Sequence, residues 1–65
     1  MTGRQASMRA NKIIEAAYAG KLDPRIAEAA VSKLEPYFDS VSIMHKSLDF
    51  SHALPDLILA WESKQ

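Results

Sequence analysis

The sequence predicts an all-α protein with heptad-spaced faces, folded as a helical hairpin or a three-helix bundle with a proline-broken C-terminal region. Apolar residues recur at steps of three and four along most of the chain, which is the period of an amphipathic helix. No alternating strand pattern or solenoid-length repeat interrupts that period. A chain of 65 residues makes one small helical domain, 1–65, in which we expect residues 1–4 to be disordered.

The first predicted helix runs from about Arg4 to Ala19. Small apolar side chains dominate its stripe, which allows a neighbouring helix to approach closely. The stripe advances by four, three and four residues, and two larger neighbours widen it: Ala6, Ala10, Ile13 and Ala17, with Ile14 and Tyr18.

The segment between the first two helices combines a helix stop with a helix start. Gly20 accepts the left-handed conformation that closes many helices. Asp23 is a good N-cap, and Pro24 suits the first helical position because its missing N–H costs nothing there. A connection this short favours antiparallel neighbours, so we expect a helical hairpin.

The second predicted helix repeats the period with larger side chains. Its stripe advances by four, three, four and three residues: Ala27, Val31, Leu34, Phe38 and Val41, with Ile26, Ala30 and Tyr37 alongside. Leu34 and Phe38 supply most of the area that it can bury. Pro36 lacks the N–H that would donate a backbone hydrogen bond inside the helix. The helix therefore either kinks near Leu34 and Glu35 or restarts there.

The third region, from Val41 to Lys64, is expected to be helical in two pieces. Its heptad-spaced stripe contains Ile43, Phe50, Leu54, Leu57 and Trp61, flanked by Leu48 and Ile58. Pro55 argues against a continuous regular helix, and Ser47 and Ser51 are plausible N-caps ahead of it. We therefore expect a break within residues 47–56 and a final helix that ends near Ser63.

The composition limits the chemistry that the chain can support. There is no cysteine, which removes disulfides and thiolate chemistry, and the two glycines are isolated, which removes a phosphate-binding loop. A helical domain of this size lacks room for a pocket that buries most of a substrate. We expect no enzymatic activity and no cofactor.

One polar row stands out in the third region, with steps of four, three and four: His45, Asp49, His52 and Asp56. On one helix these side chains share a side, but four such residues cannot all reach one metal ion. The row lies opposite the apolar stripe, which favours a solvated face over a metal site or a proton switch.

The charges are balanced overall and unevenly placed, because the front of the chain is basic and the back is acidic. Candidate phosphate contacts are Arg4, Arg9, Lys12 and Arg25. They make nucleic-acid binding the alternative function, as a small DNA-binding regulator. No apolar run is long enough to span a membrane, and no signal-peptide core follows the basic residues, so we expect a cytoplasmic protein without membrane contact.

Apolar residues outnumber the positions that three short helices can bury, so some should lie on the surface and mark an interface. The densest group comprises Leu54, Leu57, Ile58 and Trp61. Tryptophan is the residue type most enriched among binding hot spots, although Trp61 could also close a small core. We expect a protein–protein interaction module, acting as a regulator, inhibitor or adaptor and self-associating, first of all as a dimer.

The segment from Leu22 to Phe38 resembles helical segments of phage small terminase subunits and related phage proteins. An Asp-Pro-Arg sequence opens the helix and a Pro-Tyr pair follows it; the matching residues are Asp23, Pro24, Arg25, Ala29, Ala30, Leu34, Pro36 and Tyr37. The resemblance covers about a quarter of the chain. It implies a phage origin, and it extends the alternative function to a packaging-type protein with an oligomeric ring and a DNA-binding N-terminal part.

Overall fold

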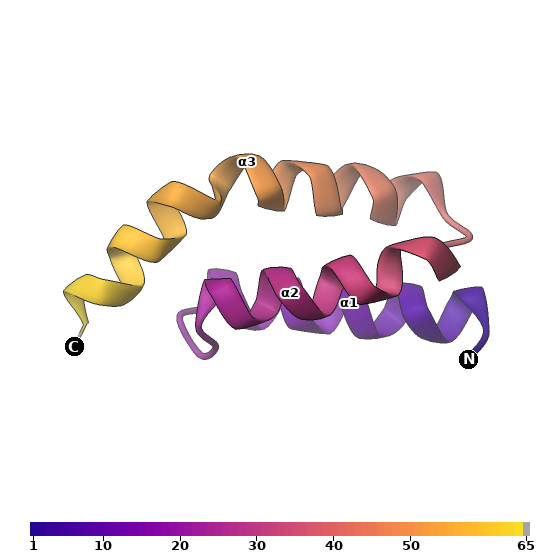
Figure 1. Cartoon of the computed structure of the whole chain (residues 1–65), viewed down its shortest axis with the longest axis horizontal. Coiled ribbons are helices and arrows are strands. Elements are labelled where there is room, and N and C mark those ends of the chain that lie inside the picture. The colour runs from indigo at the N-terminus through magenta and orange to yellow at the C-terminus, as the bar shows by residue number, and fades with distance from the viewer. Residues whose placement is uncertain (65) are drawn as a thin grey trace.

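Three α-helices pack together, and the all-α prediction is confirmed. The computed structural model describes residues 1–64, in which α1 (Gly3–Tyr18), α2 (Pro24–Leu34), a 3₁₀ turn η1 (Glu35–Tyr37) and α3 (Val41–Ser63) follow in order, with no strand among these residues. Helices α1 and α2 form the predicted hairpin, and α3 runs along it and then bends (Figure 1).

Helix α1 begins at Gly3, one residue before the predicted start at Arg4. The physical reason is a capping box. The Gln5 N–H donates to the Thr2 hydroxyl at 3.1 Å, and the Thr2 N–H donates to the Gln5 side-chain oxygen at 3.0 Å. Two N–H groups that would otherwise lack partners are thereby satisfied, which starts the helix early.

The joint between α1 and α2 follows the prediction. Gly20 has φ +72°, and its N–H donates to the Ala17 carbonyl while the Lys21 N–H donates to that of Ala16. This pair of hydrogen bonds is the pattern that closes a helix through a residue in the left-handed conformation. On the far side, the Arg25 N–H donates to the Asp23 carboxylate at 2.9 Å, and Pro24 opens α2.

The second predicted stripe ends sooner than expected. Helix α2 stops at Leu34, and Pro36 lies in η1, so the chain restarts as a 3₁₀ turn instead of kinking. Val41 was predicted to continue the stripe, and this is wrong. It opens α3 after the extended residues 38–40, and 67% of its surface is exposed.

The predicted break within residues 47–56 is also wrong, because α3 is one helix of 23 residues with Pro55 inside it. Its ribbon changes direction along its length (Figure 1). Proline removes one backbone hydrogen bond and crowds the preceding turn, which bends a helix without having to end it. Apolar contacts before and after Pro55, made by Phe50 and Leu57, hold both halves against the hairpin.

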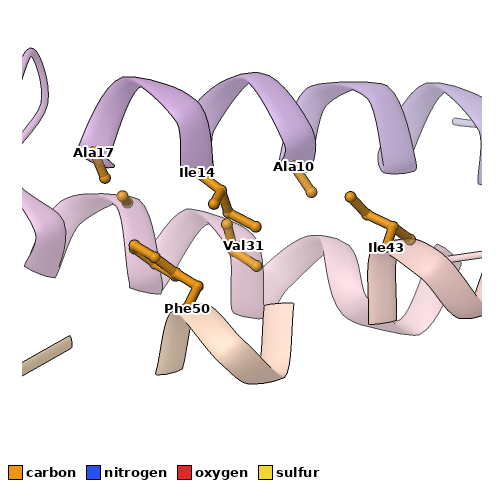
Figure 2. Close-up of a cluster of buried hydrophobic side chains, with 7 residues drawn as sticks. Ala10, Ile14, Ala17, Val31, Ile43 and Phe50 are labelled. Atoms are coloured by element: carbon orange, nitrogen blue, oxygen red, sulfur yellow. The ribbon is translucent and has the colours of Figure 1, made fainter. Parts of the chain in front are cut away.

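The core lies between the three helices (Figure 2). Its buried side chains form one cluster: Ala10, Ile14, Ala17, Ala27, Val31, Ile43 and Phe50. The exposed fraction of Ile14, Ala27 and Phe50 is 0%. The rings of Tyr18 and Phe50 meet edge to face with centroids 5.8 Å apart, a favoured aromatic geometry. Alanines therefore let α1 and α2 approach while Phe50 fills the space beneath α3.

Candidate protein-binding surface on the C-terminal helix

The side of α3 that faces the hairpin carries one heptad-spaced seam whose burial declines along the helix. The seam contains Ile43, Ser47, Phe50, Leu54, Leu57 and Trp61. Its first three members are buried, with Phe50 fully so. Its last three members are only half-buried. The hairpin therefore buries the seam side chains less completely after Phe50.

Unequal helix lengths explain this decline. At a rise of about 1.5 Å per residue, α3 is about 34 Å long and α1 about 24 Å. The final turns of α3 reach beyond the α1–α2 joint (Figure 1). Side chains of core type therefore continue onto a part of α3 that the hairpin covers incompletely.

The last turn of α3 is attached to the hairpin at its edge by polar contacts. The Lys64 ammonium donates to the Gly20 carbonyl at 2.7 Å and lies 5.9 Å from the centre of the Trp61 ring. The Arg25 guanidinium lies 3.8 Å from the Glu62 carboxylate. These contacts join the end of α3 to the hairpin.

The terminal stripe, defined as Leu54, Leu57, Ile58 and Trp61, is the predicted partner-binding group, and all four side chains are half-buried. Leu54 and Leu57 pack against the core cluster on one side. Trp61 is neither enclosed in the core nor free. The structure brings the four residues together on the second half of α3, and their role in partner binding stays a prediction.

Helix α3 carries a second group of exposed apolar residues, which the sequence does not single out. The sequence predicts Val41 in the second stripe and Leu48 flanking the third, yet 67% and 59% of their surfaces are exposed, as are 54% of Met44 and 64% of Leu59. Their spacing is also heptad-like, so the sequence held a signal. Because a core stripe and a surface stripe have the same period, only the packing separates them.

The candidate phosphate contacts do not form one patch. Arg4, Arg9 and Lys12 are exposed along α1, whereas Arg25 lies at the start of the antiparallel α2, at the other end of the hairpin. The start of α1 lies instead near the α2–α3 connection, where the Ser7 hydroxyl donates to Asp39 at 3.2 Å. Arg25 is already engaged by two carboxylates. Phosphate binding by these residues stays a prediction.

The pair of Asp23 and Arg25 shifts both acid–base equilibria. The guanidinium donates to both carboxylate oxygens, at 3.1 and 3.2 Å. This side-chain hydrogen bonding, together with the Arg25 backbone N–H, lowers the pKa of Asp23 below 3.8, and the carboxylate raises the pKa of Arg25. The ionised form of the N-cap is thus the one that the fold favours.

We expect the stability advantage of wild type over Asp23→Asn to depend on pH. Because folding lowers the pKa of Asp23, its charge stabilises the fold above pH 3.8, and this contribution is lost as the pH falls through the lowered value. Asparagine retains the capping oxygen without the charge. Thermal unfolding of both proteins between neutral pH and about pH 2 should show the difference in Tm shrinking with acid. A difference that is constant over this range would contradict the assignment.

The His–Asp row, His45, Asp49, His52 and Asp56, lies on the solvent-exposed side of α3. Within residues 1–64, no cluster of three or more histidine or acidic side chains has the arrangement of a metal site. Helix α3 nevertheless presents the row unbroken, because Pro55 does not end the helix. Its two imidazoles and two carboxylates all face outward.

A groove of about 390 Å³ lies between the first half of α3 and the segment that follows α2. Its walls are Glu35, Phe38, Met44, His45, Ser47, Leu48 and Ser51. The Ser47 hydroxyl donates to the Glu35 carboxylate at 3.4 Å at its base. Most of its other wall residues are exposed, so the groove is an open surface feature with an apolar rim.

No protein-family model, curated protein or solved structure matches the chain. The similarity of Leu22–Phe38 to phage proteins therefore stays a prediction. In the part of the chain that the structure describes, no helix combines the length and the apolar character that a membrane crossing requires.

Proposed function

We propose that the chain is a small helical protein–protein interaction module, acting as a regulator, inhibitor or adaptor, that binds its target through the terminal stripe. The observation that supports this is the declining burial of the α3 seam. Its core-type side chains continue past Phe50, where the hairpin covers them only in part. A partner that supplies an apolar segment, such as a helix, can complete the cover over these turns.

The energetic argument favours Trp61 and Leu57 as the main contacts. A half-buried tryptophan on a preformed helix loses little conformational entropy on binding, because its position is already fixed. Contacts from Lys64 to Gly20 and from Glu62 to Arg25 hold this turn in place. Apolar contact area at a rigid site is typical of binding hot spots.

Nucleic-acid binding has less support in the arrangement of charges. The exposed cations Arg4 and Arg9 lie along α1, far from Arg25, and the charge of Arg25 is balanced by Asp23 and Glu62. A phosphate-binding surface needs several such cations on one face. Phage origin and a packaging role rest on the sequence resemblance alone.

The test is affinity capture from a lysate of the source cells, with and without nuclease, followed by direct binding measurements on the captured protein. We expect one stoichiometric partner that survives nuclease, and a rise in its Kd of about thirtyfold for Trp61→Ala, the size of a typical hot-spot truncation. Ile26→Ala is the matched control, because Ile26 is an exposed apolar residue on α2.

Circular dichroism separates an interface role from a core role. If Trp61→Ala and Leu57→Ala weaken binding while helical content is retained, these side chains serve the interface. Equal loss of helix and binding would place them in the core and contradict the proposal. Retention of nucleic acid alone, with an affinity that falls steeply as salt rises, would favour phosphate binding instead.

A further inference from the structure

The side of α3 that faces away from the core carries an apolar stripe of its own. We call it the outer stripe; it contains Val41, Met44, Leu48, Pro55 and Leu59, at steps of three, four, seven and four. More than half of the surface of Met44, Leu48 and Leu59 is exposed. A helix that is apolar on two sides is normally covered on both. The hairpin covers only one side of α3.

The His–Asp row runs beside the outer stripe and has an unusual symmetry. Its steps of four, three and four residues are the same when counted from either end of the helix. Reversing the direction exchanges histidine for aspartate at every position of the row. A second row that runs antiparallel to the first therefore places each imidazole opposite a carboxylate.

We propose that two copies of this chain pair antiparallel through the outer stripes of their α3 helices. A two-fold axis between Phe50 and Ser51 sets His45 opposite Asp56 of the second copy and Asp49 opposite His52 of the second copy. In such an arrangement the same flank of each helix meets itself, which is the property of a two-fold interface. An imidazole N–H can donate to a carboxylate in either charge state of the histidine.

The apolar residues fit the same register. Leu48 lies less than one helical turn from the axis in each copy, so the two Leu48 side chains meet near the centre. The groove of about 390 Å³ opens beside Met44 and Leu48, with Phe38 in its opposite wall, and can receive apolar side chains of the second copy. The apolar contacts therefore lie along one flank of the paired α3 helices, and the His–Asp pairs lie along the other flank.

Lys46, which follows His45 in the sequence, does not compete for the row. Lys46 donates to the Asn11 side chain and lies 3.8 Å from Glu15, both on α1. Its charge is therefore balanced within its own copy. Within residues 1–64, none of the four residues of the row forms an ion pair, and each is exposed.

This self-association goes beyond the proposed function and uses a different face of α3. Trp61 and Leu57 lie on the seam that faces the hairpin, whereas Leu48 and Met44 lie on the outer stripe. Pairing through the outer stripe leaves the terminal stripe accessible. Loss of one interaction therefore does not require loss of the other.

Sedimentation equilibrium over a range of concentrations tests the pairing. Wild type should change from the 7.2 kDa monomer to twice that mass, whereas Leu48→Glu should raise the dimer Kd at least about thirtyfold, because it places two carboxylates at an apolar contact. Ile26→Glu, at an exposed apolar position on α2, should dimerise like wild type. A wild type that stays monomeric at millimolar protein would overturn the proposal, as would Leu48→Glu dimerising unchanged.

A charge exchange tests the orientation and the register. His52→Asp should raise the dimer Kd about tenfold, because two like-charged contacts replace two favourable ones. Adding Asp49→His should restore the wild-type Kd, since position 49 faces position 52 of the second copy. The double variant His52→Asp with Asp56→His has the same composition, but it should not restore the wild-type Kd. Equal rescue by both second changes, or by neither, would overturn the antiparallel register; all four residues are exposed, so the fold tolerates these changes.

Discussion

Phe50→Ala is expected to unfold most of the protein at room temperature. Phe50 is the largest fully buried side chain, and its ring packs against Tyr18 and the cluster between all three helices. Truncation of a buried phenylalanine costs about 3–5 kcal/mol, through lost transfer free energy and the cavity that remains. A single core in a domain below about 70–80 residues rarely supplies more than about 3–5 kcal/mol, so this loss is as large as the whole stability of the fold.

Urea unfolding followed by circular dichroism measures this effect, with Ile26→Ala as the control. Ile26 is an apolar residue of α2 that is 61% exposed, so its truncation should change stability by no more than about 0.5 kcal/mol. Similar unfolding midpoints for the two variants would show that Phe50 does not hold α3 on the hairpin. A measurable folded baseline for Phe50→Ala at low temperature would still allow the difference to be fitted.

The hairpin could be predicted from the sequence because its signals are local. Gly20 closes α1 through its own left-handed backbone, and Asp23 opens α2 through its own side chain. Neither depends on the rest of the fold. The sequence predicts Ile13 in the line of the α1 stripe and Ile14 beside it. In the structure Ile14 is the fully buried residue and Ile13 is partly buried, which is a shift of one position within the stripe.

The course of α3 could not be predicted because it depends on tertiary contacts. Pro55 breaks an isolated helix, whereas here Phe50 and Leu57 pack on the hairpin on both sides of it and keep the chain helical. Tertiary packing commonly overrides local propensity in this way.

The candidate site shows the same division between local and tertiary information. Its residues are visible in the heptad pattern, but the half-burial of Leu54 and Trp61 follows from α3 being longer than α1 and α2. Comparing the lengths requires the correct end of each helix, whereas the sequence predicts two helical pieces in place of α3. The outer stripe was missed for this reason too, since Val41 and Leu59 fall on one face only when α3 is continuous.

Ala27→Leu is expected to destabilise the fold by about 1–3 kcal/mol, although leucine is larger and more apolar. Ala27 is completely buried in the cluster that also contains Ala10 and Ala17 of α1. The added carbon atoms have no space between helices that approach through alanines, so α1 and α2 must separate or the side chain must adopt a strained rotamer. The expected fall in Tm is about 4–8 °C for each kcal/mol in a domain of this size.

Ala29→Leu is the matched control, because Ala29 lies two residues further along α2 and is exposed. The two variants have the same composition and almost the same helix propensity, so a difference in Tm isolates the packing between α1 and α2. If Ala27→Leu unfolds at the same temperature as Ala29→Leu, the helices have room for a larger side chain. In that case helix propensity would explain the alanines between α1 and α2, and close approach of the two helices would not.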